Sequence, residues 1–288
     1  MTIDDVKKVC VVGGGLMGKQ IALNTAVYGY DVWLYDSFPG VLPKVEDWKE
    51  GYLAGRIAKG KMTEEQVAEI KKNFHLTDKL EEAAAGSQLV IEAIVEVEDA
   101  KAELFRQLDK LVAEDTIIAT NSSFMPSSMF ADKISHPERL ANLHYFNPAL
   151  VMKLTEVVKG EHTADITGEI LAEFSRRTNK KPVILNKEIE GFIVNRISRA
   201  VTEKALELVE LGVASYEDVD IAIENGLNYP MGPFRLMDLT GIDLAYTVLK
   251  DAKEKGLPCI GYDLVKAKYE AGEYGQKTGK GWYEYSKK

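Results

Sequence analysis

One histidine of the chain stands where a catalytic acid or base could stand. His144 ends an apolar segment that has the pattern of a buried strand. An imidazole titrates near neutral pH, so it can take a proton from a hydroxyl group and return it. An isolated strand histidine can equally be a structural residue. The other three have different settings: His75 follows Phe74 in a short predicted strand, His136 precedes a proline, and His162 lies in a polar run.

A carboxylate partner would favour the catalytic interpretation of His144. A carboxylate bonded to one ring nitrogen fixes the tautomer and stabilises the imidazolium. Glu156 lies in the next apolar segment, flanked by Thr155 and Val157. An acid at such a position needs a hydrogen-bonding partner unless it faces solvent. We therefore predict that Glu156 pairs with His144, with an outward position at the sheet edge as the alternative.

Further polar side chains recur where predicted strands end. Asp36, Glu96, Ser122 and His144 each follow an apolar segment. In a doubly wound α/β sheet the carboxyl ends of parallel strands lie along one edge, where ligands bind. We therefore expect these four side chains along one edge.

A glycine turn near the start of the chain predicts which ligand binds there. Gly13, Gly15 and Gly18 occupy the G-x-G-x-x-G positions, with Leu16 and Met17 between the last two. The first glycine makes a tight turn, the second admits a pyrophosphate, and the third lets helix and strand pack closely. The phosphates would lie at the helix N-terminus, where free N–H groups favour anions. The alternative is a glycine turn without a ligand.

The acid after the second strand indicates the form of the dinucleotide. Asp36 can accept hydrogen bonds from a ribose 2′-OH. No arginine follows it directly, since the next residues are Ser37, Phe38 and Pro39. We therefore predict NAD rather than NADP as the cofactor.

Composition argues against several classes of protein. The 288 residues are 45% hydrophobic and carry a net charge of −9, whereas nucleic-acid binding requires a basic face. Two cysteines make no disulfide framework and indicate a reducing compartment. We see no signal peptide and no run long enough to span a membrane. We expect a cytoplasmic protein without a nucleic-acid partner, a membrane partner or a bound metal.

The order of predicted elements divides the chain in two. Strand and helix patterns alternate up to about Asn186, as in a doubly wound Rossmann-like sheet, and only helical patterns follow. We predict an NAD-binding domain at residues 1–187 and a helical substrate and dimerisation domain at residues 188–288. The predicted strands are residues 9–12, 31–35, 74–77, 88–94, 116–120, 139–144, 154–158 and 182–185. The predicted helices are residues 19–28, 42–59, 99–112, 165–177, 191–212, 234–239, 243–255 and 264–271, with two more starting at Thr63 and Ser215.

Seven segments form a combination that is specific although none of them is specific alone. They are residues 13–22, 90–96, 144–148, 151–158, 191–196, 229–233 and 277–281. In this combination essentially the whole chain resembles the 3-hydroxyacyl-CoA dehydrogenase family, in the style of its bacterial 3-hydroxybutyryl-CoA members. The resemblance implies NAD-dependent interconversion of short (S)-3-hydroxyacyl-CoA and 3-ketoacyl-CoA.

The resemblance also implies roles for individual residues. His144 is similar to the family's catalytic histidine and Glu156 to the glutamate paired with it. Ser122 matches the serine that contacts substrate and nicotinamide, and Asn195 matches the asparagine that polarises the substrate. Besides the glycine turn, the implied cofactor contacts are Asp36, Glu96, Lys101, Ser122, Asn147 and Lys277.

Several residues leave the identity of the substrate open. Lys59, beside Arg56 and Lys61, falls near a lysine that meets the CoA phosphates in the family. Residues 125–130 look more like the gulonate and carnitine dehydrogenase relatives, and Tyr52 stands where the family has a serine. A small polar alcohol is therefore the alternative substrate, and a non-catalytic NAD-binding protein is the third possibility.

We also expect the helical half to form a homodimer or a larger homo-oligomer. Its helices carry apolar residues on more than one face, and one small domain offers too little partner surface for them. These residues are Val201, Ala205, Leu208, Val209, Leu211, Ile221, Ile223 and Leu227.

Overall fold

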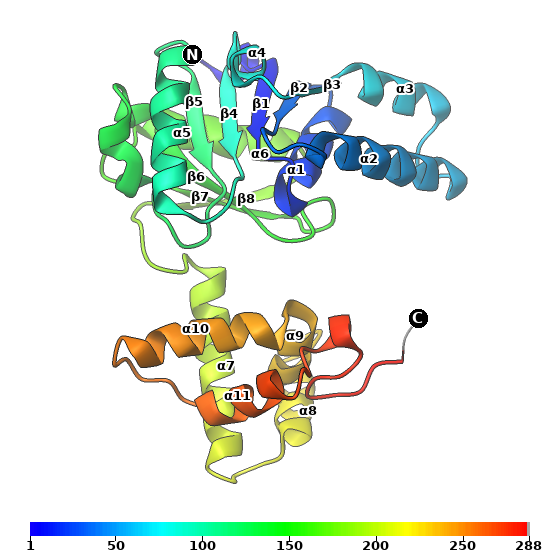
Figure 1. Ribbon diagram of the computed structural model, residues 1–288, viewed down its shortest axis with the longest axis vertical. Helices are drawn as coiled ribbons and strands as arrows, with labels where there is room; N and C mark the ends of the chain where they lie inside the picture. Colours follow the sequence, from blue (N-terminus) through cyan, green and yellow to red (C-terminus); the bar gives the residue numbers. More distant parts are fainter. Residues whose placement is uncertain (287–288) are drawn as a thin grey trace. The chain divides into compact units, whose positions relative to one another are not determined.

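An eight-stranded sheet organises the first part of the protein, whose computed structural model describes residues 1–286 (Figure 1). The order in the sheet is β3-β2-β1-β4-β5-β6-β7-β8. Neighbouring strands are parallel except β6 and β7, which are antiparallel. The strands are β1 Lys8–Val12, β2 Asp31–Tyr35, β3 Phe74–Thr77, β4 Leu89–Glu92, β5 Ile117–Thr120, β6 Leu140–Tyr145, β7 Leu154–Val158 and β8 Lys181–Leu185.

The central strands β4, β5 and β6 are buried along their whole length because helices cover both faces of the sheet. Successive residues of a strand point to opposite faces. Val9 and Val11 accordingly belong to one core cluster, with side chains of α1 and α6, while Cys10 and Val12 belong to another, with side chains of α4 and α5. The helices of this part are α1 Leu16–Val27, α2 Val41–Ala58, α3 Glu64–Lys72, α4 Leu80–Ala84, α5 Glu98–Leu111 and α6 Asp165–Arg177.

The chain separates into two compact units, Met1–Phe192 and the part from Ile193 on. The second unit is helical and has its own core, in which Leu206, Phe234 and Trp282 are buried. The carboxylate of Asp238 accepts the N–H groups of Trp282 and Tyr283, both at 2.9 Å, and so fixes the last segment onto α9. The helices are α7 Val194–Glu210, α8 Tyr216–Gly226, α9 Pro233–Thr240, α10 Ile242–Glu254 and α11 Tyr262–Glu270, followed by a 3₁₀ turn, η4 Gln276–Thr278.

The predicted fold class, a Rossmann-like sheet followed by a helical part, is confirmed. The predicted helix starts at Thr63 and Ser215 are also confirmed, since each hydroxyl accepts a backbone N–H of the first turn. The helix predicted at residues 191–212 starts later than expected, at Val194, because Gly191 and Phe192 both have positive φ, a conformation no right-handed helix uses.

One further boundary and two short elements differ from prediction. The fourth strand ends at Glu92, because the Glu92 carboxylate accepts the N–H of Ile94 at 2.7 Å and the chain turns there. The short helix α4 and the 3₁₀ segment η2 Ser127–Lys133 were not predicted. Among the described residues, no helix combines the length and the apolar character needed to cross a bilayer.

Candidate active site

The glycine turn between β1 and α1 shows three different reasons for glycine. Gly13 has φ +107°, a value that side chains rarely tolerate. A Cβ at Gly18 would lie 1.8 Å from the carbonyl oxygen of Gly13, so the close packing of helix on strand requires glycine there. A Cβ at Gly15 would meet no atom within 4 Å. The fold therefore needs Gly13 and Gly18, whereas Gly15 leaves room for a phosphate at the start of α1.

Asp36 joins this turn to the end of β2. One carboxylate oxygen accepts the N–H of Gly14 at 2.7 Å, and the other accepts the N–H of Phe38 at 2.8 Å. A carboxylate oxygen can accept more than one hydrogen bond, and Asp36 is only half-buried. The residues present therefore fit the pyrophosphate and the 2′-OH of a dinucleotide.

A buried charge network lies at the ends of β4 and β5. The ammonium of Lys101 on α5 is 2.5 Å from Glu92 and 3.3 Å from Glu96, and its side chain is 1% exposed. The hydroxyl of Thr120 donates to the second oxygen of Glu92 at 2.6 Å. Lys101 thus lies beneath Glu96, whose carboxylate is the exposed end of the network.

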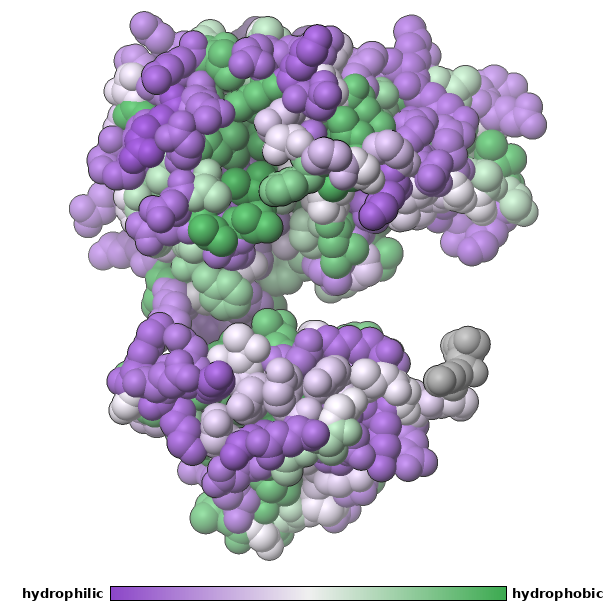
Figure 2. All heavy atoms as spheres, viewed as in Figure 1, coloured by the Kyte–Doolittle hydropathy of each residue, from purple (hydrophilic) through white to green (hydrophobic). Residues whose placement is uncertain are grey.

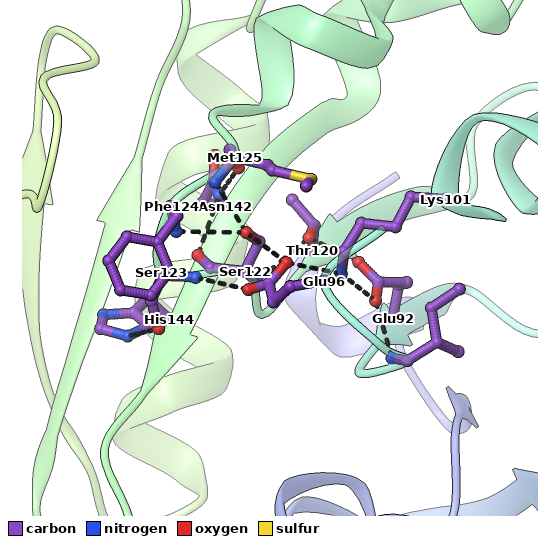
Figure 3. Close-up of polar contacts among 11 residues, drawn as sticks. Glu92, Glu96, Lys101, Thr120, Ser122, Ser123, Phe124, Met125, Asn142 and His144 are labelled. Carbon is purple, nitrogen blue, oxygen red and sulfur yellow. Dashed lines mark hydrogen bonds and ion pairs between the residues drawn. The ribbon is translucent and has the colours of Figure 1, made fainter. Parts of the chain in front are cut away.

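Glu96 in turn holds the segment that follows β5. It accepts the hydroxyl of Ser122 at 2.9 Å and the backbone N–H of Ser123 at 3.1 Å (Figure 3). The Ser122 oxygen also accepts the N–H of Met125 at 2.8 Å. The Ser122 hydroxyl therefore both donates and accepts a hydrogen bond within this loop network, whereas the Ser123 hydroxyl bonds to a different partner.

That partner is His144. Its Nε2 lies 2.9 Å from Oγ of Ser123, and its Nδ1 lies 2.9 Å from Glu156. The pair forms because β6 and β7 place His144 and Glu156 directly opposite each other. An ionised carboxylate only accepts, so Nδ1 carries the proton, and Nε2 is left to accept the Ser123 hydroxyl.

The His144 pair lies in a nearly closed setting. His144 is 3% exposed and Glu156 is 1% exposed. The rings of Phe146 and Phe192 meet the imidazole edge-on, with centroids 4.6 and 5.5 Å away. Such a setting excludes water and strengthens the electrostatic contact between imidazole and carboxylate. The arrangement can hold a proton at Nε2 and stabilise the resulting imidazolium.

The structure brings together part of the predicted site. Asp36, Glu96, Ser122 and His144 all lie at carboxyl ends of strands, as the sheet pattern predicts. The exposed Asn147 follows β6, and the exposed Lys59 follows α2. Asn195, at the start of α7, and Lys277, whose ammonium is 2.5 Å from Asp243, belong to the second unit. The functional roles assigned to all these residues, and to the glycine turn, remain predictions.

Three residues of the site were missed. Ser123 adjoins Ser122 in the sequence, and nothing in the sequence distinguishes the two hydroxyl groups. Asn142 interrupts the apolar strand two positions before His144, and that spacing is a signal that could have found it. Glu92, a fully buried acid, stands in an apolar strand in the same way.

A second polar cluster lies on the far end of the same loop. The hydroxyl of Ser127 donates to Glu188 at 2.9 Å and lies 3.3 Å from Nε2 of His162. Burial lowers the pKa of His162, and the charge of Glu188 opposes that shift. His162, which the sequence placed in a polar run, is therefore a partly buried contact of the segment after β5.

Two family models cover the chain. The 3-hydroxyacyl-CoA dehydrogenase NAD binding domain matches residues 8–189, and the 3-hydroxyacyl-CoA dehydrogenase C-terminal domain matches residues 191–285. The mitochondrial hydroxyacyl-coenzyme A dehydrogenase of Homo sapiens is 40% identical over 97% of this chain and 91% of its own. The 3-hydroxybutyryl-CoA dehydrogenase of Clostridioides difficile is 36% identical over 97% of this chain and 100% of its own.

A solved structure agrees with these matches. The crystal structure of (S)-3-hydroxybutyryl-CoA dehydrogenase from Ralstonia eutropha has a TM-score of 0.89 and 32% identity, covering 98% of this chain and 100% of that one. The first family model describes an NAD-binding domain, so the predicted cofactor is confirmed. The chain therefore belongs to the 3-hydroxyacyl-CoA dehydrogenase family of NAD-dependent oxidoreductases.

Proposed function

We propose that this protein interconverts a short (S)-3-hydroxyacyl-CoA and its 3-ketoacyl-CoA, with 3-hydroxybutyryl-CoA and acetoacetyl-CoA as the pair. The observation that carries the proposal is the position of His144 between Glu156 and Ser123, at the edge of a dinucleotide-binding sheet. Relatives named 3-hydroxybutyryl-CoA dehydrogenase, at 36% and 33% identity, support the short acyl chain.

Bound NAD supplies the hydride acceptor, and NADH supplies the donor in the reverse direction. In oxidation, Nε2 of His144 takes the proton of the substrate's C3 hydroxyl. In reduction, the imidazolium returns that proton to the developing alkoxide. Glu156 keeps Nδ1 protonated, orients the ring and stabilises the imidazolium. The Nδ1 proton therefore stays in place while the transferred proton moves between Nε2 and the substrate oxygen.

Two further groups would hold the substrate oxygens. Ser122 was predicted to contact the substrate and the nicotinamide, but its hydroxyl is engaged by Glu96 and two backbone N–H groups. In this proposal the contact passes to Ser123, whose hydroxyl lies on His144. Asn195 is proposed to donate to the thioester oxygen, which makes the substrate more reactive. Asn147 and Lys277 are proposed as further NAD contacts.

The CoA part of the substrate would bind through positive charge. The exposed Lys59 and Lys61 lie just after α2, next to Arg56. Ammonium groups attract the phosphates of CoA although the chain as a whole carries a net charge of −9. We propose this basic group, Arg56, Lys59 and Lys61, as the phosphate contact.

A substrate panel tests the proposal. NADH oxidation is measured with acetoacetyl-CoA, with longer 3-ketoacyl-CoAs and with free acetoacetate, and NAD reduction is measured with gulonate and carnitine. We expect the highest kcat/KM with acetoacetyl-CoA and a far lower value with acetoacetate. Turnover of gulonate or carnitine alone would show that a small polar alcohol is the substrate. Tight NADH binding without turnover of any of these compounds would show that the protein is non-catalytic.

We also propose that the second unit forms a homodimer. Large apolar side chains of α7, of α8, of the turn between them and of the residue after α8 are exposed, and Figure 2 shows apolar surface among the polar side chains of this unit. These are Leu208, Leu211, Val213, Ile221 and Leu227. The free Cys10 and Cys259 fit a reducing compartment such as the cytoplasm. A monomer in sedimentation at micromolar concentration would reject the dimer.

A further inference from the structure

Asn142 is a buried amide whose partners all belong to one loop. It lies on β6, is 0% exposed, and makes no exposed contact. Its Nδ2 donates to the carbonyls of Met125 at 3.0 Å and Ser122 at 3.4 Å (Figure 3). Its Oδ1 accepts the N–H of Ser127 at 2.8 Å. One side chain thus satisfies three backbone groups of the segment from Ser122 to Ser127.

The position of Asn142 on β6 matters because His144 follows two residues later. Side chains two apart on a strand point to the same face. The same strand therefore carries the imidazole and the amide that holds the loop opposite to it. Ser123, whose hydroxyl lies 2.9 Å from His144, stands inside the stretch that Asn142 fixes.

We propose that Asn142 is a positioning residue for the dehydrogenase reaction, which sets the Ser123 hydroxyl against Nε2 of His144. The kinetic part of this inference rests on the proposed function. The segment between β5 and η2 has no regular backbone pairing of its own, so the amide substitutes for it. Without the amide, two buried backbone groups and one partly buried one lose their partner, and the loop must shift to find others. A shift of about 1 Å in a positioned group can lower turnover about 10²-fold.

A double-variant experiment separates positioning from general support of the fold. The variants are Asn142→Ala, Ser123→Ala and the combination of both, with kcat measured on acetoacetyl-CoA and the Kd of NADH measured by titration. We expect Asn142→Ala to lower kcat about 10–10²-fold with NADH affinity kept. In the Ser123→Ala background the same change should lower kcat less than about threefold, because the group it positions is already absent. Losses that multiply in the double variant would overturn the proposal.

A conservative variant tests the donor half of the amide. Asn142→Asp keeps an acceptor for the Ser127 N–H, but it directs an ionised oxygen at the carbonyls of Met125 and Ser122. A protonated aspartate can donate as the amide does. The kcat of Asn142→Asp, relative to wild type at each pH, should therefore rise as the pH falls. A flat ratio across the pH range would contradict the donor role.

A matched control removes a buried amide elsewhere in the same unit. Asn24 on α1 is 6% exposed and donates to the carbonyl of Thr178 at 3.2 Å. Asn24→Ala should lower the melting temperature about as much as Asn142→Ala while kcat stays at the wild-type value. If Asn142→Ala fails to fold, Asn142→Asp and Asn142→Ser take its place in the double-variant comparison.

A measurement without substrate keeps this inference separate from the proposed function. The ¹⁵N shifts of the His144 imidazole are followed by NMR in the free protein and assigned with His144→Gln. Asn142→Ala should move the Nε2 signal in the same direction as Ser123→Ala, and the double variant should match Ser123→Ala. An unmoved Nε2 signal in Asn142→Ala would overturn the positioning role, even if acyl-CoA turnover is as proposed. Correct shifts without acyl-CoA turnover would reject only the proposed substrate.

Discussion

Two regions of the sheet are built differently: the proposed cofactor end, which is the turn after β1, and the proposed proton-transfer end, which lies between β5, β6 and β7. The turn after β1 offers backbone N–H groups and open space where a side chain would otherwise be, as at Gly15. The site between β5, β6 and β7 works through side chains that reach one another across strands, as Ser123, His144 and Glu156 do. The first is made by six consecutive residues, whereas the second needs three strands in register. A phosphate is bound well by adjacent backbone N–H groups, whereas proton transfer requires an imidazole held in one orientation.

The difference extends to what a substitution can do in each region. In the glycine turn an added atom is harmful because it fills space, either within the fold or in front of a ligand. In the His144 site a removed atom is harmful because His144 and Glu156 are buried and each polar group there is the hydrogen-bonding partner of another. The following experiments test this comparison.

The largest effect is expected at the proton-transfer end. His144→Gln should lower kcat about 10²–10⁴-fold, the usual contribution of a general acid or base. The Kd of NADH should stay near the wild-type value, because the glycine turn is not altered. Steady-state kinetics and NADH titration check both halves. Turnover near the wild-type rate would show that another group moves the proton.

A pair of alanine substitutions tests the cofactor end. Gly18→Ala should destabilise the protein strongly, since its Cβ would overlap the Gly13 carbonyl at 1.8 Å. Gly15→Ala should keep the melting temperature, because its Cβ meets nothing within 4 Å, but it should weaken NADH binding about tenfold or more. Thermal unfolding and NADH titration separate the two outcomes. Equal NADH affinity in Gly15→Ala and wild type would place the pyrophosphate elsewhere.

A smaller effect is expected from the acid after β2. Asp36→Ala combined with Ser37→Arg should lower the preference for NADH over NADPH, because a carboxylate repels a 2′-phosphate and an arginine attracts it. The loss of the bond to the Gly14 N–H should weaken NADH binding as well. The ratio of kcat/KM values for the two cofactors is the measurement. A ratio that does not change would remove Asp36 from the ribose site.

The smallest effect is expected from the exposed charges. Replacing Lys59 and Lys61 by alanine should raise KM for acetoacetyl-CoA a few-fold at low salt and leave kcat unchanged, because exposed ion pairs contribute about 0.2–1 kcal/mol each. Added salt should remove the difference. Lys71 and Lys72 on α3, replaced together, are the control of equal charge. If the double variant and the wild type have the same KM at every ionic strength, Arg56, Lys59 and Lys61 do not bind the CoA phosphates.

The same comparison explains what the sequence could predict. The glycine turn, the strands around it and Asp36 follow from adjacent residues, so their placement could be predicted from local pattern alone. The contact between His144 and Glu156 was also predicted, because an acid within an apolar segment needs a polar partner and the family resemblance pairs the two residues. Ser123 and Asn142 were missed, since their roles depend on how an irregular loop lies against β6.

Two element boundaries differ from prediction because of single local features. The start of α7 depends on positive φ at Phe192, which a bulky residue seldom adopts and a sequence pattern does not reveal. The early end of β4 depends on the Glu92 carboxylate turning back to the Ile94 N–H. Both are local contacts that only coordinates identify.

The antiparallel pairing of β6 and β7 has a consequence for refolding. A slip of one residue between the two strands would turn Glu156 to the other face of the sheet and leave His144 without its carboxylate. Helix content would be nearly unchanged in such a chain. Circular dichroism would then show native helix content while the contact between His144 and Glu156 is still unformed. After dilution from denaturant, the recovery of activity therefore reports when the register between β6 and β7 forms. It should lag behind the recovery of helix content measured by circular dichroism.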